Sequence, residues 1–237
     1  MAVDNNSFFQ YNETRAVSGY RSAWLVKKST DAKYHLVGAT ETVPYVFGDK
    51  ETFEYDLLQS PTKGQVEGKM SLESQDIEVL HHRDNAYRFG KLKDEGILDF
   101  MVINAEFVGY KFTGTIDYKP NNAEADVNRA TVTITPMSAS VTPILNARDD
   151  IQETLFFKNA IPATVKVSDK IDFTTQVATA AFNVKSIDAN GAESSTTTSD
   201  VTTTDATVTF LKKGLYVITA SMSDNSYAPW STTVYVE

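Results

Sequence analysis

Apolar and polar residues alternate most clearly between residues 108 and 136. In "GYKFTGTIDYKP" (109–120), Tyr110, Phe112, Ile116 and Tyr118 fall on one side of a period-two pattern. "NRATVTITP" (128–136) repeats the pattern with Ala130, Val132 and Ile134. The opposite side of both segments carries Lys111, Thr113, Thr115, Asp117, Lys119, Thr131, Thr133 and Thr135. Because successive strand residues face opposite ways, we predict a strand pair with one packed face and one wetted, threonine-rich face.

Other segments before residue 140 have the aromatic and β-branched content of strands. They are 20–28, 51–59, 64–73 and 96–107, and Gly and Pro turn signals separate them. The segment 74–96 lacks alternation, and it holds Leu80, Tyr87, Phe89 and Leu92 among many charges. We predict one helix there, beginning between Asp76 and Arg83, with Gly96 as its C-terminal cap. A helix against a sheet makes the first domain α+β, and the chain as a whole mainly β.

Composition changes between residues 140 and 162, where two prolines lie in a polar stretch that reads as a connector. "ETLFF" (153–157) within it is a possible last strand of the first part. We divide the chain into domains 1–160 and 161–237, with the boundary near Pro162. Short strands are predicted at 163–167, 176–187, 206–210, 214–222 and 231–237, which suggests a small β-sandwich. The Ser- and Thr-rich stretch 194–207 is predicted to be a mobile loop within it.

The chain has 237 residues, 22 basic and 31 acidic, with a formal charge of −9 and no Cys. An acidic chain is a poor candidate for tight nucleic-acid binding, which needs basic residues to displace counterions. Disulfides and thiolate metal sites are excluded. The N-terminal residues lack the pattern of a signal peptide, and no apolar run approaches a membrane span. We therefore expect a soluble protein made in a cytoplasm, without membrane partners.

The strongest hint of catalysis is "HHRDN" (81–85), which contains the His-Arg-Asp of the protein-kinase catalytic loop. The position of the kinase metal-binding Asn is Phe89 here, and neither Asp-Phe-Gly nor a glycine-rich phosphate loop occurs. Adjacent His residues on a helix point about 100° apart, so a shared metal is disfavoured against a solvated helix face. No Ser-centred nucleophile motif is present. We expect no enzyme activity, no cofactor and no metal.

Two segments resemble a known family. The first consists of "DLLQSPTKGQVEGKMSLESQDIEVLHHRDNAYRFGKLK" (56–93) and, shortly after it, "DFMVINAEFVGYKFTGTIDYKPNNAEADVNRATVTITPMSAS" (99–140). Its order of predicted elements and its general residue pattern are similar to those of the tail tube (major tail) proteins of long-tailed bacteriophages. The resemblance covers residues 1–160. "GLYVITASMSDNSYAPWSTTVYVE" (214–237) resembles bacterial Ig-like domains, which often follow the tube domain in that family.

The family resemblance implies a structural virion protein in the phage tail, assembled in the host cytoplasm. Its copies would form stacked, hexameric rings around one inner β-barrel, with a tape-measure protein and then double-stranded DNA in the lumen and a tail terminator protein as a further partner. The resulting candidates for the lumenal face are Lys111, Thr113, Thr115, Asp117, Thr131, Thr133 and Thr135. Candidates for contacts between rings are Asn121, Asn122, Glu124 and Asp126, with the arms 1–18 and 137–150.

The Ig-like domain would hang from the connector outside the tube and contact host-surface glycans weakly but in many copies. Tyr227 and Trp230 have rings that can stack on a sugar, although packing within the protein is their more ordinary role. Two other readings stay open. One is a monomeric cell-surface or secreted binding protein with two β-rich domains, and the other is an enzyme with a carbohydrate-binding appendage.

Overall fold

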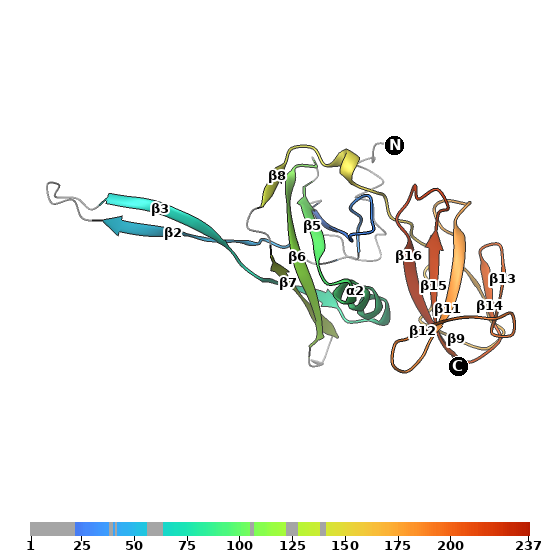
Figure 1. Cartoon of the computed structure of the whole chain (residues 1–237). Coiled ribbons are helices and arrows are strands. Elements are labelled where there is room, and N and C mark those ends of the chain that lie inside the picture. The colour runs from blue at the N-terminus through green and yellow to red at the C-terminus, as the bar shows by residue number, and fades with distance from the viewer. Residues whose placement is uncertain are drawn as a thin grey trace.

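The computed structural model describes residues 22–37, 40, 42–55, 64–104, 107–121, 128–137 and 141–237. Within these ranges the chain forms two β-rich units and one α-helix, α2 (Arg83–Glu95). The N-terminal unit ends near Ile151 and the C-terminal unit begins near Leu155, since these two residues belong to different cores. Figure 1 shows α2 lying between the sheet of the N-terminal unit and the sheets of the C-terminal unit. The predicted class, mainly β with one helix, is confirmed for the described residues.

The N-terminal unit is built on a six-stranded antiparallel sheet. Its strands run in the order β1 (Ala23–Lys27), β5 (Leu98–Ile103), β6 (Gly109–Pro120), β7 (Arg129–Pro136) and β4 (Gln75–Leu80), with β8 (Thr142–Ile144) beside the start of β6. The predicted strand pair is confirmed as β6 and β7, which pair from Gly114 with Pro136 to Pro120 with Ala130. A short 3₁₀ turn, Arg148–Asp150, follows β8.

The start of α2 corrects part of the sequence prediction. The helix begins at Arg83, the later of the two predicted limits, and the six residues Gln75–Leu80 form strand β4. Ile77 and Val79 of β4 are buried while Asp76 and Glu78 are exposed, a short alternation that the sequence analysis had placed in the helical segment. Gly96 is confirmed as the cap, because its φ of 76° lets its N–H reach the carbonyl of Lys93.

The main core of the N-terminal unit lies between α2 and one face of the sheet. Phe89 of α2 is fully buried, and its ring stacks on those of Trp24 and Tyr118. Phe112, Ile116, Val132 and Ile134 pack into the same cluster. Among the described residues, a second cluster covers part of the other face of the sheet, over β1, β5 and β8; it contains Leu25, Tyr34, Met101, Ile103, Phe107, Ile144, Ala147 and Ile151.

Strands β2 (Phe47–Tyr55) and β3 (Gly64–Leu72) form a hairpin that projects away from both units (Figure 1). They pair with each other as a separate two-stranded sheet. The hairpin is anchored only near its base among the described contacts: the amide of Glu73 donates to the carbonyl of Val46, and Phe47 packs edge-on against Tyr110. The predicted strands at 51–59 and 64–73 correspond to this hairpin, shifted by a few residues in the first strand.

The C-terminal unit is a β-sandwich, as predicted. One sheet has five strands in the order β12 (Glu193–Ser195), β11 (Ala181–Ile187), β15 (Gly214–Ser221), β16 (Trp230–Val236) and β9 (Thr164–Val165). The other has three: β10 (Lys170–Asp172), β14 (Thr207–Phe210) and β13 (Val201–Thr204). Both sheets contribute to one core that includes Phe173, Val184, Phe210, Ile218 and Val234.

Two local predictions in the second half of the chain are wrong. The stretch 194–207 is not simply a loop, because its threonines pair as β13 against β14 while Val201 is buried in the sandwich core. "ETLFF" is not a strand of the N-terminal unit, since Leu155 and Phe157 pack in the sandwich core. The C-terminal core thus begins a few residues before the expected division at 160.

The segment 137–150 also differs from the independent arm that we expected. Its strand β8 pairs with Gly109–Lys111, and Ile144 and Ala147 are buried against the sheet. Apolar residues spaced along a polar stretch give little periodic signal, although they suffice to fix it in place.

Candidate functional surface

The polar face of the N-terminal sheet lies opposite α2. Phe112, Ile116, Val132 and Ile134 pack on the helix side, so the alternate residues of β6 and β7 must point the other way. All seven candidates for the lumenal face share this side. They are Lys111, Thr113, Thr115, Asp117, Thr131, Thr133 and Thr135, and each is half-buried or exposed. The structure therefore brings the predicted set together on one surface, which we call the polar face.

Strand β4 extends the polar face with side chains that the sequence analysis left out. Asp76 lies opposite Thr133 and Glu78 opposite Thr131 in the β4–β7 register. Thr133 Oγ1 donates to Asp76 at 2.6 Å, and Arg129 forms an ion pair with Glu78 at 2.7 Å. These residues were missed because β4 was read as part of the helix.

The polar face carries balanced formal charge. Its acidic residues are Asp76, Glu78, Asp99 and Asp117, and its basic residues are Lys27, Lys111, Lys119 and Arg129. Most of them are paired: Lys27 lies 3.3 Å from Asp99, and Asp117 lies 3.2 Å from Lys119. Lys93, reaching from the end of α2, hydrogen-bonds to Asp117 and lowers the pKa of that carboxyl.

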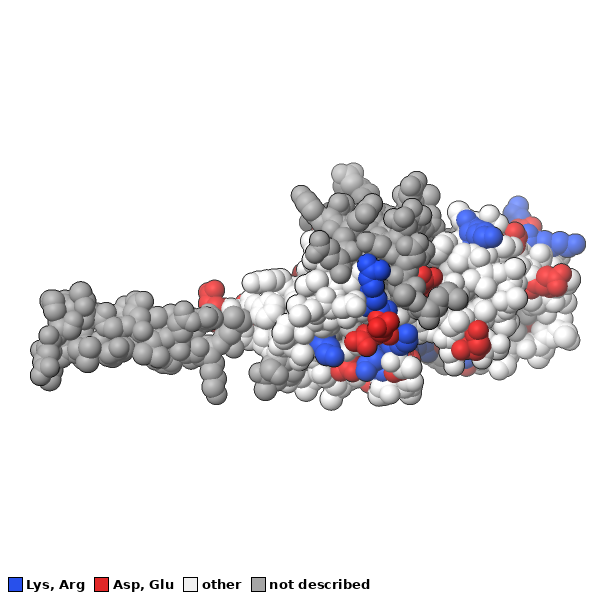
Figure 2. Space-filling view, turned by 90° about the horizontal axis from the view of Figure 1, so that it is seen from above, with Lys and Arg blue, Asp and Glu red and all other residues white. Residues whose placement is uncertain are grey.

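Threonine hydroxyls complete this pattern. Thr113 donates to Asp99 and Thr131 to Asn121, and Ser74 donates to Thr135. Seen from above, the visible described surface of the N-terminal unit likewise has Lys and Arg side by side with Asp and Glu (Figure 2). A surface whose polar groups satisfy one another offers phosphate groups no row of unpaired cations.

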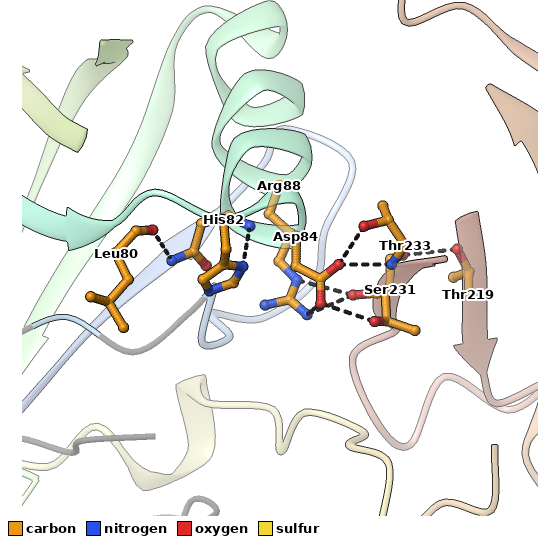
Figure 3. Close-up of polar contacts among 9 residues, drawn as sticks. Leu80, His82, Asp84, Arg88, Thr219, Ser231 and Thr233 are labelled. Atoms are coloured by element: carbon orange, nitrogen blue, oxygen red, sulfur yellow. Dashed lines mark hydrogen bonds and ion pairs between the residues drawn. The ribbon is translucent and has the colours of Figure 1, made fainter. Parts of the chain in front are cut away.

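The side of α2 that faces away from the sheet contacts the C-terminal unit. Figure 3 shows Asp84 and Arg88 directed at β16. Asp84 accepts hydrogen bonds from the amide and hydroxyl of Thr233, at 2.7 and 2.6 Å, and from the hydroxyl of Thr232 at 2.9 Å. The expected solvated helix face is therefore wrong for Asp84, which is 8% exposed.

The neighbouring histidines have structural contacts. His82 is the N-cap of α2, and its side chain accepts from the amide of Asn85. The Nδ1 atom of His81 lies within hydrogen-bond distance, 2.8 Å, of the hydroxyl oxygen of Tyr118. Among the described residues, no three acidic or histidine side chains are grouped so that they could hold a metal ion.

The remaining predicted residues have separate positions. Asn121 is exposed at the end of β6, while Asn122, Glu124 and Asp126 lie outside the described residues. Trp230 is 6% exposed, and the Arg88 guanidinium lies 3.6 Å from the centre of its ring, so this indole is not a surface platform for a sugar.

Comparison with protein-family models and with curated protein sequences gives no match. In the described part of the chain, no helix is both long enough and apolar enough to cross a membrane.

Proposed function

We propose that this chain is a structural protein that assembles with copies of itself into stacked, hexameric rings, forming the tail tube of a long-tailed bacteriophage. The rings would conduct double-stranded DNA into the host and would hold a tape-measure protein beforehand. The resemblance of residues 1–160 to tail tube proteins motivates this proposal, and features of the N-terminal unit support it.

The observation that carries the proposal is the projecting hairpin of β2 and β3. A two-stranded hairpin is marginally stable in water without a surface to pack against. Within the described residues, this one pairs only with itself beyond its base and stands clear of both cores (Figure 1). A neighbouring copy would provide the missing surface, so the hairpin is suited to joining subunits.

The N-terminal sheet offers a second feature suited to assembly. Strand β4 is at the end of the strand order, and the polar face that it shares with β6 and β7 is a wetted surface on the side away from α2. A sheet edge left open invites pairing with another chain. In a ring, adjacent sheets would close into a barrel whose lining is the polar face, with α2 and the C-terminal unit outside it.

The lumenal assignment follows from this arrangement. The candidate wall residues are Lys111, Thr113, Thr115, Asp117, Thr131, Thr133 and Thr135, extended by Asp76 and Glu78. A wall of balanced, paired charge would let a polyanion pass without multivalent attraction. The parallel pairing of β9 with β16 in the sandwich is compatible with an Ig-like domain, for which weak contact with host glycans is part of the proposal.

The test is electron microscopy of negatively stained protein at high concentration, comparing the parent with a chain whose hairpin is shortened. Thr52 and Glu67 are paired, so residues 53–66 can be replaced by Asn-Gly to close a shorter hairpin. We expect rings or hollow tubes from the parent and none from the shortened variant, while circular dichroism and the melting temperature change little because both cores are intact.

A control deletes Ala189 from the exposed turn 189–191 of the sandwich, which keeps the Asn-Gly already present there, and it should assemble like the parent. Rings formed equally well by the shortened variant would contradict the role of the hairpin. A parent that stays monomeric under all conditions, including with other tail proteins, would favour the monomeric binding protein instead.

A further inference from the structure

Helix α2 is shared by the two units. Its apolar side, with Phe89 and Leu92, belongs to the core of the N-terminal sheet. Its opposite side carries Arg83, Asp84 and Arg88, all of which contact the C-terminal unit. Among the described residues, the sandwich is therefore attached through the three residues between Ile151 and Leu155 and through α2.

The second attachment is centred on Asp84. This carboxylate is buried at the junction, and all three of its hydrogen-bond donors listed above come from Thr232 and Thr233 of β16. Hydrogen bonds to a charged group are about twice as strong as those between neutral groups. The same carboxylate lies 3.9 Å from Arg88, one helical turn away.

Arg88 completes the attachment. Its Nε and Nη2 atoms both donate to the carbonyl of Ser231, at 3.1 and 2.6 Å. Its guanidinium also stacks over the ring of Trp230 at 3.6 Å. Arg88 therefore contacts the strand through its backbone and through a core residue of the sandwich, and the side chain is only 8% exposed.

The spacing of these contacts matches the helix to the strand. Asp84 and Arg88 are four residues apart, which is a rise of about 6 Å along a helix. Their partners Thr233 and Ser231 are two residues apart, which is about 6.7 Å along a strand. The two pairs can therefore form at the same time.

Further contacts lie along the same side of α2. Arg83 donates to the carbonyl of Ala163 at 2.8 Å, beside the parallel pair of β9 and β16. Towards the other end, Tyr87 and Lys91 bind the carboxylate of Glu193 at 2.9 and 2.6 Å. These contacts flank the contacts of Asp84 and Arg88 with β16, so they oppose rotation of the sandwich about Asp84 and Arg88.

We propose that Asp84 and Arg88 act as a latch that holds the C-terminal sandwich in one orientation on α2, so that the two units move as one body. The sandwich is then carried by the helix instead of hanging from the connector, which replaces our earlier expectation of a tethered domain. Any surface that it presents has a fixed direction relative to the polar face. The latch lies within a single chain and does not depend on ring assembly.

The test measures the distance between spin labels on the two units by pulsed electron paramagnetic resonance. The chain has no Cys, so labels can be attached to Leu145→Cys and Asn190→Cys, both exposed positions. Labelled protein is diluted into unlabelled protein so that only distances within one chain are measured. We expect one narrow distance distribution in the parent.

The latch variant is Asp84→Ala with Arg88→Ala, which removes both charges and leaves neither buried without its partner. We expect its distance distribution to be at least twofold wider than that of the parent. Asp94→Ala on the same helix is the control, because Asp94 is exposed, and it should match the parent. A broad distribution in the parent, or parent-like width in a folded double variant, would overturn the latch.

Thr233→Val provides a test that leaves α2 unchanged. The substitution has nearly the same shape and removes one hydroxyl donor to Asp84. If circular dichroism shows that the double variant does not fold, this variant decides the matter. Widening of its distance distribution supports the latch, and a width equal to that of the parent contradicts it.

Discussion

Adding positive charge to the polar face is the sharpest test of its proposed role as the wall of a channel. The substitutions are Thr115→Lys and Thr133→Lys, one on each of the paired strands β6 and β7. Both side chains lie on the polar face, and neither belongs to a core. We therefore expect folding and ring formation to continue, with the charge of the face raised from balance to an excess of two per copy.

The size of the effect follows from the neighbours of each position. The new lysine at position 133 lies opposite Asp76 and Asp117, so its charge is partly compensated. The lysine at position 115 lies opposite Thr135 and stays uncompensated. Each lysine that meets a phosphate adds about 0.9 to the slope of log K against log salt. For each copy, the uncompensated lysine alone predicts that affinity for duplex DNA falls about 3.5-fold between 50 and 200 mM salt, and a full contact from both lysines sets the upper limit at about 12-fold.

The assay is fluorescence anisotropy of a labelled DNA duplex with assembled protein at these two salt concentrations, alongside electron microscopy to confirm assembly. The control carries Thr202→Lys and Thr204→Lys on β13 of the sandwich, which add the same charge at exposed positions outside the proposed channel. Six copies in a ring would bring about twelve new lysines together around one duplex, and such clustering strengthens phosphate binding. Assembled polar-face variants that bind DNA no better than the control would refute the lumenal assignment.

Two further predictions concern stability. Hydrogen bonds from Lys91 and Lys185 lower the pKa of Glu193 to about 2. The stabilising contribution of this carboxylate is therefore present above about pH 4.3, the pKa expected for an unfolded Glu, and is lost as the pH falls toward 2. In urea titrations from pH 6 to pH 2.5, Glu193→Gln should be less stable than the parent at pH 6 and should lose less stability on acidification, whereas an equal pH dependence would contradict the pairing. Gly90→Ala should stabilise the chain by about 0.5–1 kcal/mol, because its Cβ would meet nothing within 4 Å on the helix. Gly114→Ala should destabilise it, since its Cβ would lie 2.5 Å from the carbonyl oxygen of Thr135; thermal unfolding of the two variants should shift in opposite directions.

The proposed latch and the proposed self-assembly of the sheet unit would together orient the sandwich domains. If rings form, the latch would place every sandwich at the same angle on the outside, so that a weak ligand contact is repeated in a regular array. Multivalent binding gains most when several contacts engage at once without reorientation. A free tether would instead let each copy search independently and would lose orientational order.

The sequence by itself determined the elements whose residues alternate or cap in the ordinary way. Strands β6 and β7, their polar face and the cap at Gly96 followed from side-chain periodicity and backbone freedom, which are local properties. The sandwich followed from several short strands separated by turn residues. Strand β4 was missed because its alternation covers only four residues beside a helix rich in charge. The segment 74–96 therefore contains both the two-residue period of a strand and the 3.6-residue period of a helix.

Only the tertiary structure decided what the polar side of α2 faces. Arg83, Asp84 and Arg88 occupy the side away from the apolar residues, where a sequence pattern predicts water. The structure instead buries Asp84 and Arg88 against β16, because a backbone carbonyl and hydroxyls of that distant strand satisfy their hydrogen bonds as water would, while the exposed Arg83 donates to the carbonyl of Ala163. A polar residue shows in the sequence that it needs a partner, but the partner itself, more than 140 positions away, is fixed only when the two units come together.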